Sequence, residues 1–465
     1  MTTPFDGARL LTLAAALALA GCAQAPARPD TAPGDALARA QVPAQLPGSG
    51  ISQAATPLAW RDWLRDPQLL AWVNTALQHN RDLQVAVLAV QRAQAQLGLA
   101  DAARQPVVGV GVGASRAPNS KGVEATTWTG GVQLAAWEID LFGRLSSLSD
   151  AARAQLLASE AGRRAAELSL VAAVVQAGLA VQADDELLAL ARQAVDSRQQ
   201  SVKLAKLRES VGAASQLELQ GQLSLLAQAQ ATLAQVQRQQ AQDRNALGLL
   251  LGQAPDDARL AARPASRLAD DSWLAAVPVG LSSQVLLRRP DVITAEQALL
   301  AAKANLAAAR AAYWPTLTLT GQAGQASPQL SGLFQGGNFV YTVASSLALT
   351  VFDGGRRQAN EDVARANQQV AQAQYERAIQ AAFRDTADAL AGVGTWREQL
   401  AAQQALLQSA RETLRLTDLK AANGAASVLE QLEAQRAVWV AEQAVVQVRL
   451  AELNNRVALY KALGG

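Results

Sequence analysis

The sequence predicts a mostly helical chain that also contributes strands to a membrane β-barrel. Alanine, glutamine and leucine dominate its 465 residues and aromatic residues are only 4%, a composition typical of long packed helices. One unit, a helix that ends at a proline and is followed at once by an alternating strand, occurs twice, at 81–114 and 289–324. Because a duplicated unit decides how the rest of the chain is organised, we interpret each half as one copy of the same design.

The chain is predicted to divide into successive segments. A signal peptide, 1–21, and a Pro/Ala/Gly-rich tether, 22–59, precede the ordered body. Two repeats follow, at 60–252 and 289–465, and each is predicted to hold a helix, a β-hairpin and a long helical hairpin. The proline-containing segment 253–288 connects the repeats and is predicted to lie outside the main bundle.

The amino terminus has the features of a targeting segment. Arg9 precedes a short apolar run that ends in the sequence LAGC at 19–22, and this run is too short to span a bilayer. The arrangement resembles the bacterial lipoprotein signal, in which cleavage before the cysteine leaves that cysteine lipidated. The resemblance implies lipid attachment at Cys22 and, because Ala23 rather than Asp follows, delivery to the outer membrane. The alternative is an ordinary signal peptide with an incidental cysteine.

In the first repeat, a helix over 67–105 is ended by Pro106 and leads into two strands. Valine alternates with glycine over 108–113, and the return strand, 126–139, has one apolar and one polar face. The apolar face holds Trp128, Val132 and Leu134, and the polar face holds Thr127, Thr129 and Gln133. This pattern fits a barrel wall with lipid outside and water inside, although a half-buried soluble hairpin gives the same pattern.

A long helical hairpin completes the first repeat. Its first helix is predicted over 144–208 and its second over 216–252. The turn between them has the sequence Gly-Ala-Ala-Ser at 212–215, which places Gly212 at a helix C-cap and Ser215 at a helix N-cap.

The second repeat is predicted to copy this order. Its elements are a helix over 290–314, strands over 316–324 and 339–352, a long helix over 357–420 and a last helix over 428–465. The turn recurs residue for residue at 424–427, so Gly424 and Ser427 are assigned the same capping roles.

The helix lengths fit together within each repeat. At about 1.5 Å per residue, the helix over 144–208 would extend roughly 97 Å, and those over 67–105 and 216–252 roughly 58 and 55 Å. The second repeat gives roughly 96 Å for its long helix and roughly 37 and 57 Å for its shorter ones. Each repeat is therefore predicted to place two shorter helices end to end beside one long helix.

Four strands per chain are too few for a closed barrel, because bacterial outer-membrane barrels need about eight or more. Open strand edges are not tolerated in lipid, so other copies must complete the wall. Two chains would give about eight strands and an interior filled by side chains, whereas three would give about 12 and leave a pore. Identical subunits favour closed rings, and the helical hairpins of three chains would be enough to close a hollow helical cylinder.

Several local motifs carry a resemblance to a known family. They are Trp60–Pro67 (WRDWLRDP), Ala76–Leu83, Pro278–Glu296 (PVGLSSQVLLRRPDVITAE), Phe352–Arg356 and Leu459–Gly465 (LYKALGG). They resemble the TolC-like outer-membrane efflux channels, in the lipoprotein branch that works with resistance-nodulation-division pumps. The resemblance implies a homotrimer in outer-membrane lipid that extends into the periplasm. Its chains would share a barrel of about 12 strands, and their long helical hairpins would form an α-barrel tunnel. It also implies a periplasmic adaptor and an inner-membrane pump as partners, and passive exit for the substrates that they deliver.

The resemblance also implies a periplasmic gate. In related channels a Leu and an Asp of the second long helix line the closed tip, and the matching residues here are Leu414 and Asp418. The corresponding residues of the first repeat are Val202 and Lys206, so that repeat lacks the acid. A ring of leucines and aspartates can plug a pore and select cations by charge. The alternative is that Asp418 is one more solvated helix charge.

Adaptor docking is implied at the two turns, through Gly212, Ser215, Gly424 and Ser427. The alternative is that the duplicated turns only cap helices. The family often has Arg-Tyr shortly before the turn glycine, whereas this chain has Arg208-Glu209 and Lys420-Ala421. This departure leaves the choice of adaptor open.

Other classes of function receive little support from the sequence. A net charge of +2 gives no basic field for nucleic acid, and a single cysteine and a single histidine predict no metal site. Phosphate-loop and nucleophile-turn motifs are absent, so we expect neither an enzyme nor a cofactor. Two alternatives remain: the exit duct of a type I protein secretion or heavy-metal export system, and a periplasmic coiled-coil structural or adaptor lipoprotein. The second predicts one helical hairpin rather than two.

Overall fold

The computed structural model describes residues 33–47, 59–118, 122, 124–254, 268–269, 273–276, 282–335 and 337–465. Cys22 and the predicted signal peptide lie outside the described residues, as do parts of the predicted tether and of the predicted connection at 253–288. Of the tether, the short helix α2 (Pro33–Arg39) and the residues up to 47 are described.

The chain forms two compact units, and each draws on both sequence repeats. The sheet unit contains Val90–Ser159 and Thr294–Glu376. The helical unit contains Leu37–Ala89, Glu160–Ile293 and Arg377–Gly465. Each unit is described by itself below.

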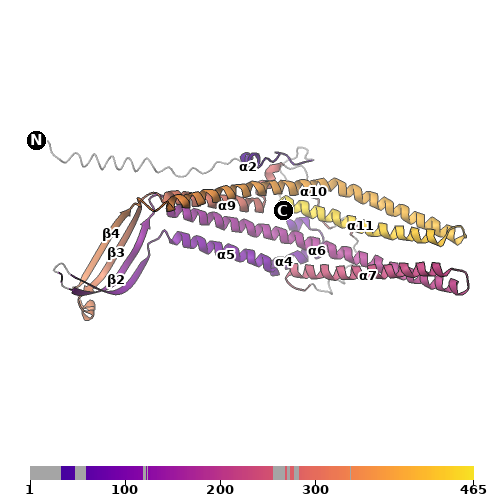
Figure 1. Cartoon of the computed structure of the whole chain (residues 1–465), viewed down its shortest axis with the longest axis horizontal. Coiled ribbons are helices and arrows are strands. Elements are labelled where there is room, and N and C mark those ends of the chain that lie inside the picture. Colours follow the sequence, from indigo (N-terminus) through magenta and orange to yellow (C-terminus); the bar gives the residue numbers. More distant parts are fainter. Residues whose placement is uncertain are drawn as a thin grey trace. The chain divides into compact units, whose positions relative to one another are not determined.

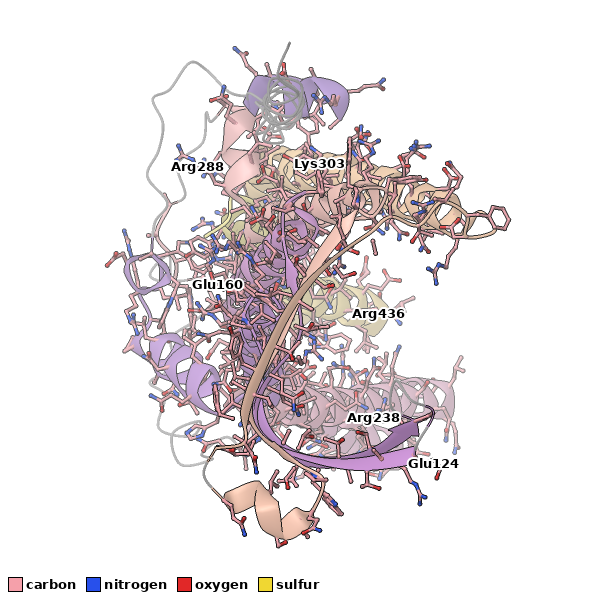
Figure 2. The ribbon with its side chains drawn as sticks, turned by 90° about the vertical axis from the view of Figure 1, so that its left-hand side faces the viewer. Glu124, Glu160, Arg238, Arg288, Lys303 and Arg436 are labelled. Atoms are coloured by element: carbon pink, nitrogen blue, oxygen red, sulfur yellow. The ribbon has the colours of Figure 1, made fainter. Side chains whose placement is uncertain are left out.

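Four strands form the antiparallel sheet of the sheet unit, in the order β1-β2-β3-β4 (Figure 1). They are β1 (Val108–Pro118), β2 (Glu124–Ile139), β3 (Thr316–Ser327) and β4 (Phe339–Ala348). Both predicted hairpins are therefore confirmed, and the pairing of β2 with β3 joins them into one curved sheet (Figure 2). The short helix η2 (Leu330–Phe334) lies in the β3–β4 connection.

Strand β4 ends at Ala348, so the predicted strand over 339–352 is too long. The physical reason is the connection to the next helix, α10 (Arg356–Ala422). Asp353 accepts hydrogen bonds from the backbone N–H groups of Gly355 and Arg357, 3.2 and 3.1 Å long, and this local cap replaces strand pairing.

The sheet exposes apolar side chains in a single chain. On β1, Val110 is 82% exposed, and every residue of β4 is exposed, with Tyr341 at 74%. Within the described part of the chain, β1 and β4 each pair with one strand only. Soluble proteins rarely leave long apolar edge strands open, because such edges recruit other strands.

Two glycines permit the close approach of the repeats at the centre of the sheet. Gly131 of β2 lies opposite Gly324 of β3. A Cβ atom added at Gly131 would collide with the carbonyl oxygen of Ala323 and lie 2.6 Å from the Cα of Gly324. No side chain fits there, so the pairing of the two repeats depends on glycine at this crossing.

We predict that Gly131→Ala destabilises the sheet, because the new methyl group must push β2 away from β3. The expected loss is about 1–3 kcal/mol, measured by urea unfolding in detergent with circular dichroism. Gly113→Ala is the matched control, since its Cβ would lie 3.6 Å from the Thr129 hydroxyl, an ordinary contact. Equal stability of the two variants would contradict this account of the crossing.

The helices mostly follow the predicted ranges. They are α4 (Pro67–His79), α5 (Arg81–Ala102), α6 (Arg144–Ser210), α7 (Gln216–Leu251), α9 (Pro290–Ala311), α10 and α11 (Val428–Ala462). Helices α6 and α10 contribute residues to both units. One stretch of α6 is long and apolar enough, by composition, to cross a membrane, but half of it is buried inside the protein.

The prediction of one helix over 67–105 is wrong, because the chain breaks at Asn80. The Asn80 backbone is extended, with φ −65° and ψ 128°. Its side-chain oxygen accepts from the N–H of Leu83 at 2.9 Å, and its side-chain nitrogen donates to the carbonyl of Leu250 at 3.0 Å. Asn80 therefore starts α5 and also binds the end of α7.

An apolar core lies in the helical unit. Trp63 stacks on Tyr460, with ring centroids 4.0 Å apart and planes at 4°. Leu69 of α4, Val174 of α6 and Leu251 of α7 belong to the same buried cluster. The residues that carry the family resemblance near 60–67 and 459–465 thus meet in one core, which holds the two ends of the ordered body together.

Arg289 links the start of α9 to both neighbouring helices of the helical unit. Its side chain is only 7% exposed and binds the Asp291 carboxylate at 2.7 and 3.0 Å. It also donates to the carbonyl oxygens of Ala462, at 3.0 Å, and Ala382, at 3.3 Å. Burial raises the pKa of Asp291, but the hydrogen bonds and the charge of Arg289 together with backbone N–H groups outweigh burial and hold that pKa below its usual range.

Arg289→Ala is predicted to destabilise the helical unit by roughly 3 kcal/mol, because the buried carbonyl oxygens of Ala382 and Ala462 lose this cationic donor. Thermal unfolding in detergent measures the effect. The neighbouring Arg288, exposed and labelled in Figure 2, is the control. A loss of the same size in Arg288→Ala would show that general charge, not the Arg289 contacts, matters.

Candidate functional site

The two helical turns share one backbone geometry. Gly212 and Gly424 have φ values of 72° and 71°, in the left-handed region that favours glycine. The residue after each glycine donates its N–H back to a backbone carbonyl of the preceding helix. Ala213 donates to Arg208 at 2.7 Å, and Ala425 donates to Lys420 at 2.8 Å. These bonds satisfy a carbonyl group at the end of each helix. They require the left-handed backbone conformation, which explains the glycine at each turn.

Serine caps the helix that follows each turn. The hydroxyl of Ser215 accepts from the N–H of Glu218 at 3.1 Å, and that of Ser427 accepts from the N–H of Glu430 at 3.2 Å. Only the second turn adds the reciprocal bond, in which the N–H of Ser427 donates to the Glu430 carboxylate at 2.7 Å. In the first turn, Glu218 instead lies 3.8 Å from the Arg208 guanidinium.

Each turn also presents an exposed leucine. Leu217 is 84% exposed and Leu429 is 65% exposed, and each follows its capping serine by two positions. No role was predicted for Leu217 or Leu429 from the sequence. Their equivalent positions in the duplicated turn are the signal that could have found them, because an apolar residue kept at an exposed position in both copies suggests a contact surface.

The predicted gate residues have different surroundings. Leu414 is half-buried and lines a cleft between α10 and the neighbouring helices α6, α7 and α11 of its own chain. Asp418, one turn further along α10, is exposed, and its carboxylate accepts from the side-chain amide of Gln431 at 2.7 Å. In the first repeat, Val202 is buried and Lys206 is exposed.

Comparisons with known proteins agree with this duplicated arrangement of strands and hairpins. The sequence profile named "Outer membrane efflux protein" matches residues 72–253 and 281–465, which include both turns and the predicted gate. The chain belongs to the outer membrane efflux protein family.

Among the relatives of this outer membrane efflux protein is the "Antibiotic efflux pump outer membrane protein ArpC" of Pseudomonas putida. It is 37% identical over 470 residues, covering 98% of this chain and 95% of ArpC. The "Cation efflux system protein CusC" of Escherichia coli is 36% identical over 467 residues, covering 98% and 99% of the two chains. The crystal structure of the open state of the Neisseria gonorrhoeae MtrE outer membrane channel has a TM-score of 0.81 at 34% identity, and the match covers 91% and 95% of the two chains.

The family membership confirms the predicted fold class and the outer-membrane location, and it assigns an efflux function. The roles of the four turn residues and of Leu414 and Asp418 stay predictions. Among the described residues, no three His, Cys, Asp or Glu side chains come together in a way that could hold a metal ion.

In this outer membrane efflux protein, the strand-to-helix junctions are built twice, as the turns are. The Asp140 carboxylate accepts from the N–H groups of Ser146, at 2.7 Å, and Leu145, at 3.2 Å, and so caps α6. Burial would raise the pKa of Asp140, but these backbone hydrogen bonds outweigh burial and lower it. Asp353 caps α10 in the same way, so both long helices start from a fixed carboxylate.

The capping box of the second turn is predicted to weaken in acid. The backbone N–H and then the hydroxyl of Ser427 lower the pKa of Glu430 from its ordinary 4.5. A lowered folded-state pKa gives stability that is present above the unfolded value and is lost as pH falls through the folded value. Hydrogen exchange of the segment 422–435 should therefore speed up as pH falls below about 4.5, after correction for intrinsic exchange.

Glu430→Gln should remove this acid-dependent step and leave exchange faster at neutral pH. Glu433→Gln, at an exposed position on the same helix, serves as the control and should retain the step. An acid step of the same size in Glu430→Gln would assign the effect to another group.

Proposed function

We propose that three copies of this chain form the exit duct of a tripartite efflux system, into which a periplasmic adaptor and an inner-membrane pump deliver the substrate. The observation that carries this proposal is the four-stranded sheet, whose outer strands β1 and β4 each have one edge without a partner strand in the described ranges of the chain. Backbone groups in a bilayer need hydrogen-bond partners, and three such sheets joined edge to edge would close a ring of about 12 strands.

The proposed division of labour along the chain follows the repeats. Residues 1–21 direct export, Cys22 carries lipid, and 22–59 is the tether. Two hydrogen bonds support a tether that lies along the helical unit. The side-chain amide of Gln380 donates to the carbonyl of Ala40, and the backbone N–H of Ser283 donates to the carbonyl of Ala44. The repeats 60–252 and 289–465 each supply one hairpin to the tunnel.

The two turns are the proposed docking sites for the adaptor. Gly212 and Gly424 set the backbone, Ser215 and Ser427 cap the helices, and the exposed leucines supply apolar surface. An adaptor that buries Leu217 and Leu429 would gain the hydrophobic contact that both turns leave unused in the single chain. The duplicated geometry supports two similar docking sites per chain.

Leu414 and Asp418 are the proposed gate. The hydrogen bond from Gln431 supports this role for Asp418, because it fixes the carboxylate on the surface of α10. In a trimer, three such carboxylates would meet at the tip, where they would repel anions and attract cations.

The duct is proposed to be passive and to have no catalytic role. ArpC is named for antibiotics and CusC for cations, so relatives of similar length and sequence serve chemically different cargo. We propose that cargo is selected mainly by the pump, and that this chain provides the route across the outer membrane.

Asp418→Ala is predicted to raise the single-channel conductance of the purified protein in planar bilayers and to lower its cation selectivity, because the ring loses its charge. Glu398→Ala, at an exposed position on the same helix, is the control and should conduct like the unmodified protein. If Asp418→Ala also conducts like the unmodified protein, Asp418 is not part of the gate.

A further inference from the structure

A cleft of about 170 Å³ lies between the two helical hairpins of the helical unit. It is smaller than the roughly 300–1,000 Å³ of pockets that hold drug-sized ligands, so its occupant must be small. Apolar side chains line much of it: Leu190, Ala194, Leu225, Ala229, Leu414 and Val438. The polar residues of the lining are Gln193, Ser197, Arg198, Gln228, Gln435, Arg436, Trp439 and Glu442.

Two guanidinium groups, those of Arg198 on α6 and Arg436 on α11, border this cleft. Arg198 is half-buried and donates to the neutral side-chain oxygen of Gln435 at 2.8 Å. Burial, together with the nearby charge of Arg436, lowers the pKa of Arg198. Among the described residues, neither arginine forms an ion pair with a carboxylate.

The one carboxylate in the lining is already engaged. Glu442 accepts from the Arg411 guanidinium at 2.7 Å, and this neighbour offsets its charge. The balance of charge at the cleft is therefore positive, and a bound anion would relieve the repulsion between Arg198 and Arg436.

Trp439 adds an unused donor. Its ring lines the cleft, and its indole N–H is buried without a hydrogen-bond acceptor among the described residues. Buried donors of this kind are rare in folded proteins, because an unmade hydrogen bond costs free energy. This N–H is closed off from solvent in the single chain, so an acceptor atom of a ligand would reach it after the indole ring turns toward the cleft.

We infer that the cleft binds a small organic carboxylate of about the size of benzoate. Its carboxylate would accept from Arg198 and, once the indole ring turns toward the cleft, from the N–H of Trp439. Its apolar body would pack against Leu190, Leu225 and Leu414. An inorganic anion would leave these apolar walls without a partner, and a neutral apolar molecule would leave the guanidinium groups uncompensated.

The ligand would contact α6 and α7 of one hairpin and α10 and α11 of the other. Since Leu414 lines the same cleft, a bound carboxylate would brace the helix that carries the proposed gate. This consequence rests on the proposed function. The binding itself does not, because it requires only the described contacts of one chain.

The test is a titration of the full-length, detergent-purified protein with benzoate, in which saturation-transfer NMR measures binding at each concentration. Saturable binding near 1 mM is expected for a ligand of this size. Benzamide, which has the same shape without the charge, should bind at least tenfold more weakly, since it lacks the charged acceptor.

Variants of the lining residues test whether benzoate binds in the cleft. Trp439→Phe keeps an aromatic ring but removes the N–H donor, and Arg198→Gln removes a charge; each should weaken benzoate binding by roughly tenfold. Arg238→Gln is the matched control, an exposed arginine of α7 that does not line the cleft and is labelled with Arg436 in Figure 2. It should bind as the unmodified protein does.

Three results would overturn the inference: no saturable binding of benzoate, equal binding of benzamide, or Trp439→Phe and Arg238→Gln variants with the same affinity. Because Trp439→Phe is a conservative change, it keeps the test decisive even if Arg198→Gln fails to fold. Single-channel recordings test the proposed duct separately, so failure of either idea can be told from failure of the other.

Discussion

The outward-facing backbone groups of β1 and β4 find no partner strand in the described part of one chain, and this constraint shapes the molecule. In water such an edge invites aggregation, and in a bilayer it costs several kcal/mol for each unsatisfied group. The apolar side chains of these strands are exposed as well. We therefore expect this chain to reach its working state by joining copies, a need that would explain the exposed edges of the sheet.

Duplication supplies matching parts for such an assembly. Each repeat brings a strand pair, a junction capped by an aspartate and a helical hairpin with the same turn. Contacts between the repeats include the glycine crossing of β2 and β3 in the sheet unit and the core around Trp63 and Tyr460 in the helical unit. Glycines permit the close approach of β2 and β3, and large aromatic side chains fill the core of the helical unit.

Much of the fold could be predicted from the sequence because its signals are local. Prolines mark the starts and ends of helices, alternation marks the strands, and the Gly-Ala-Ala-Ser turn fixes both hairpins. The break at Asn80 could not be predicted, because it depends on a hydrogen bond to Leu250, far along the chain. The cleft near Leu414 likewise needs four helices to be placed together. Exposed Leu217 and Leu429 were visible in the sequence, but their meaning depends on exposure that only the structure gives.

The central claim is that one chain is structurally incomplete. Native mass spectrometry of the Cys22→Ala protein, which cannot be lipidated, tests it most directly. The account predicts that the protein still requires detergent and that each particle contains three chains. A stable single chain, monodisperse in buffer without detergent, would contradict the account.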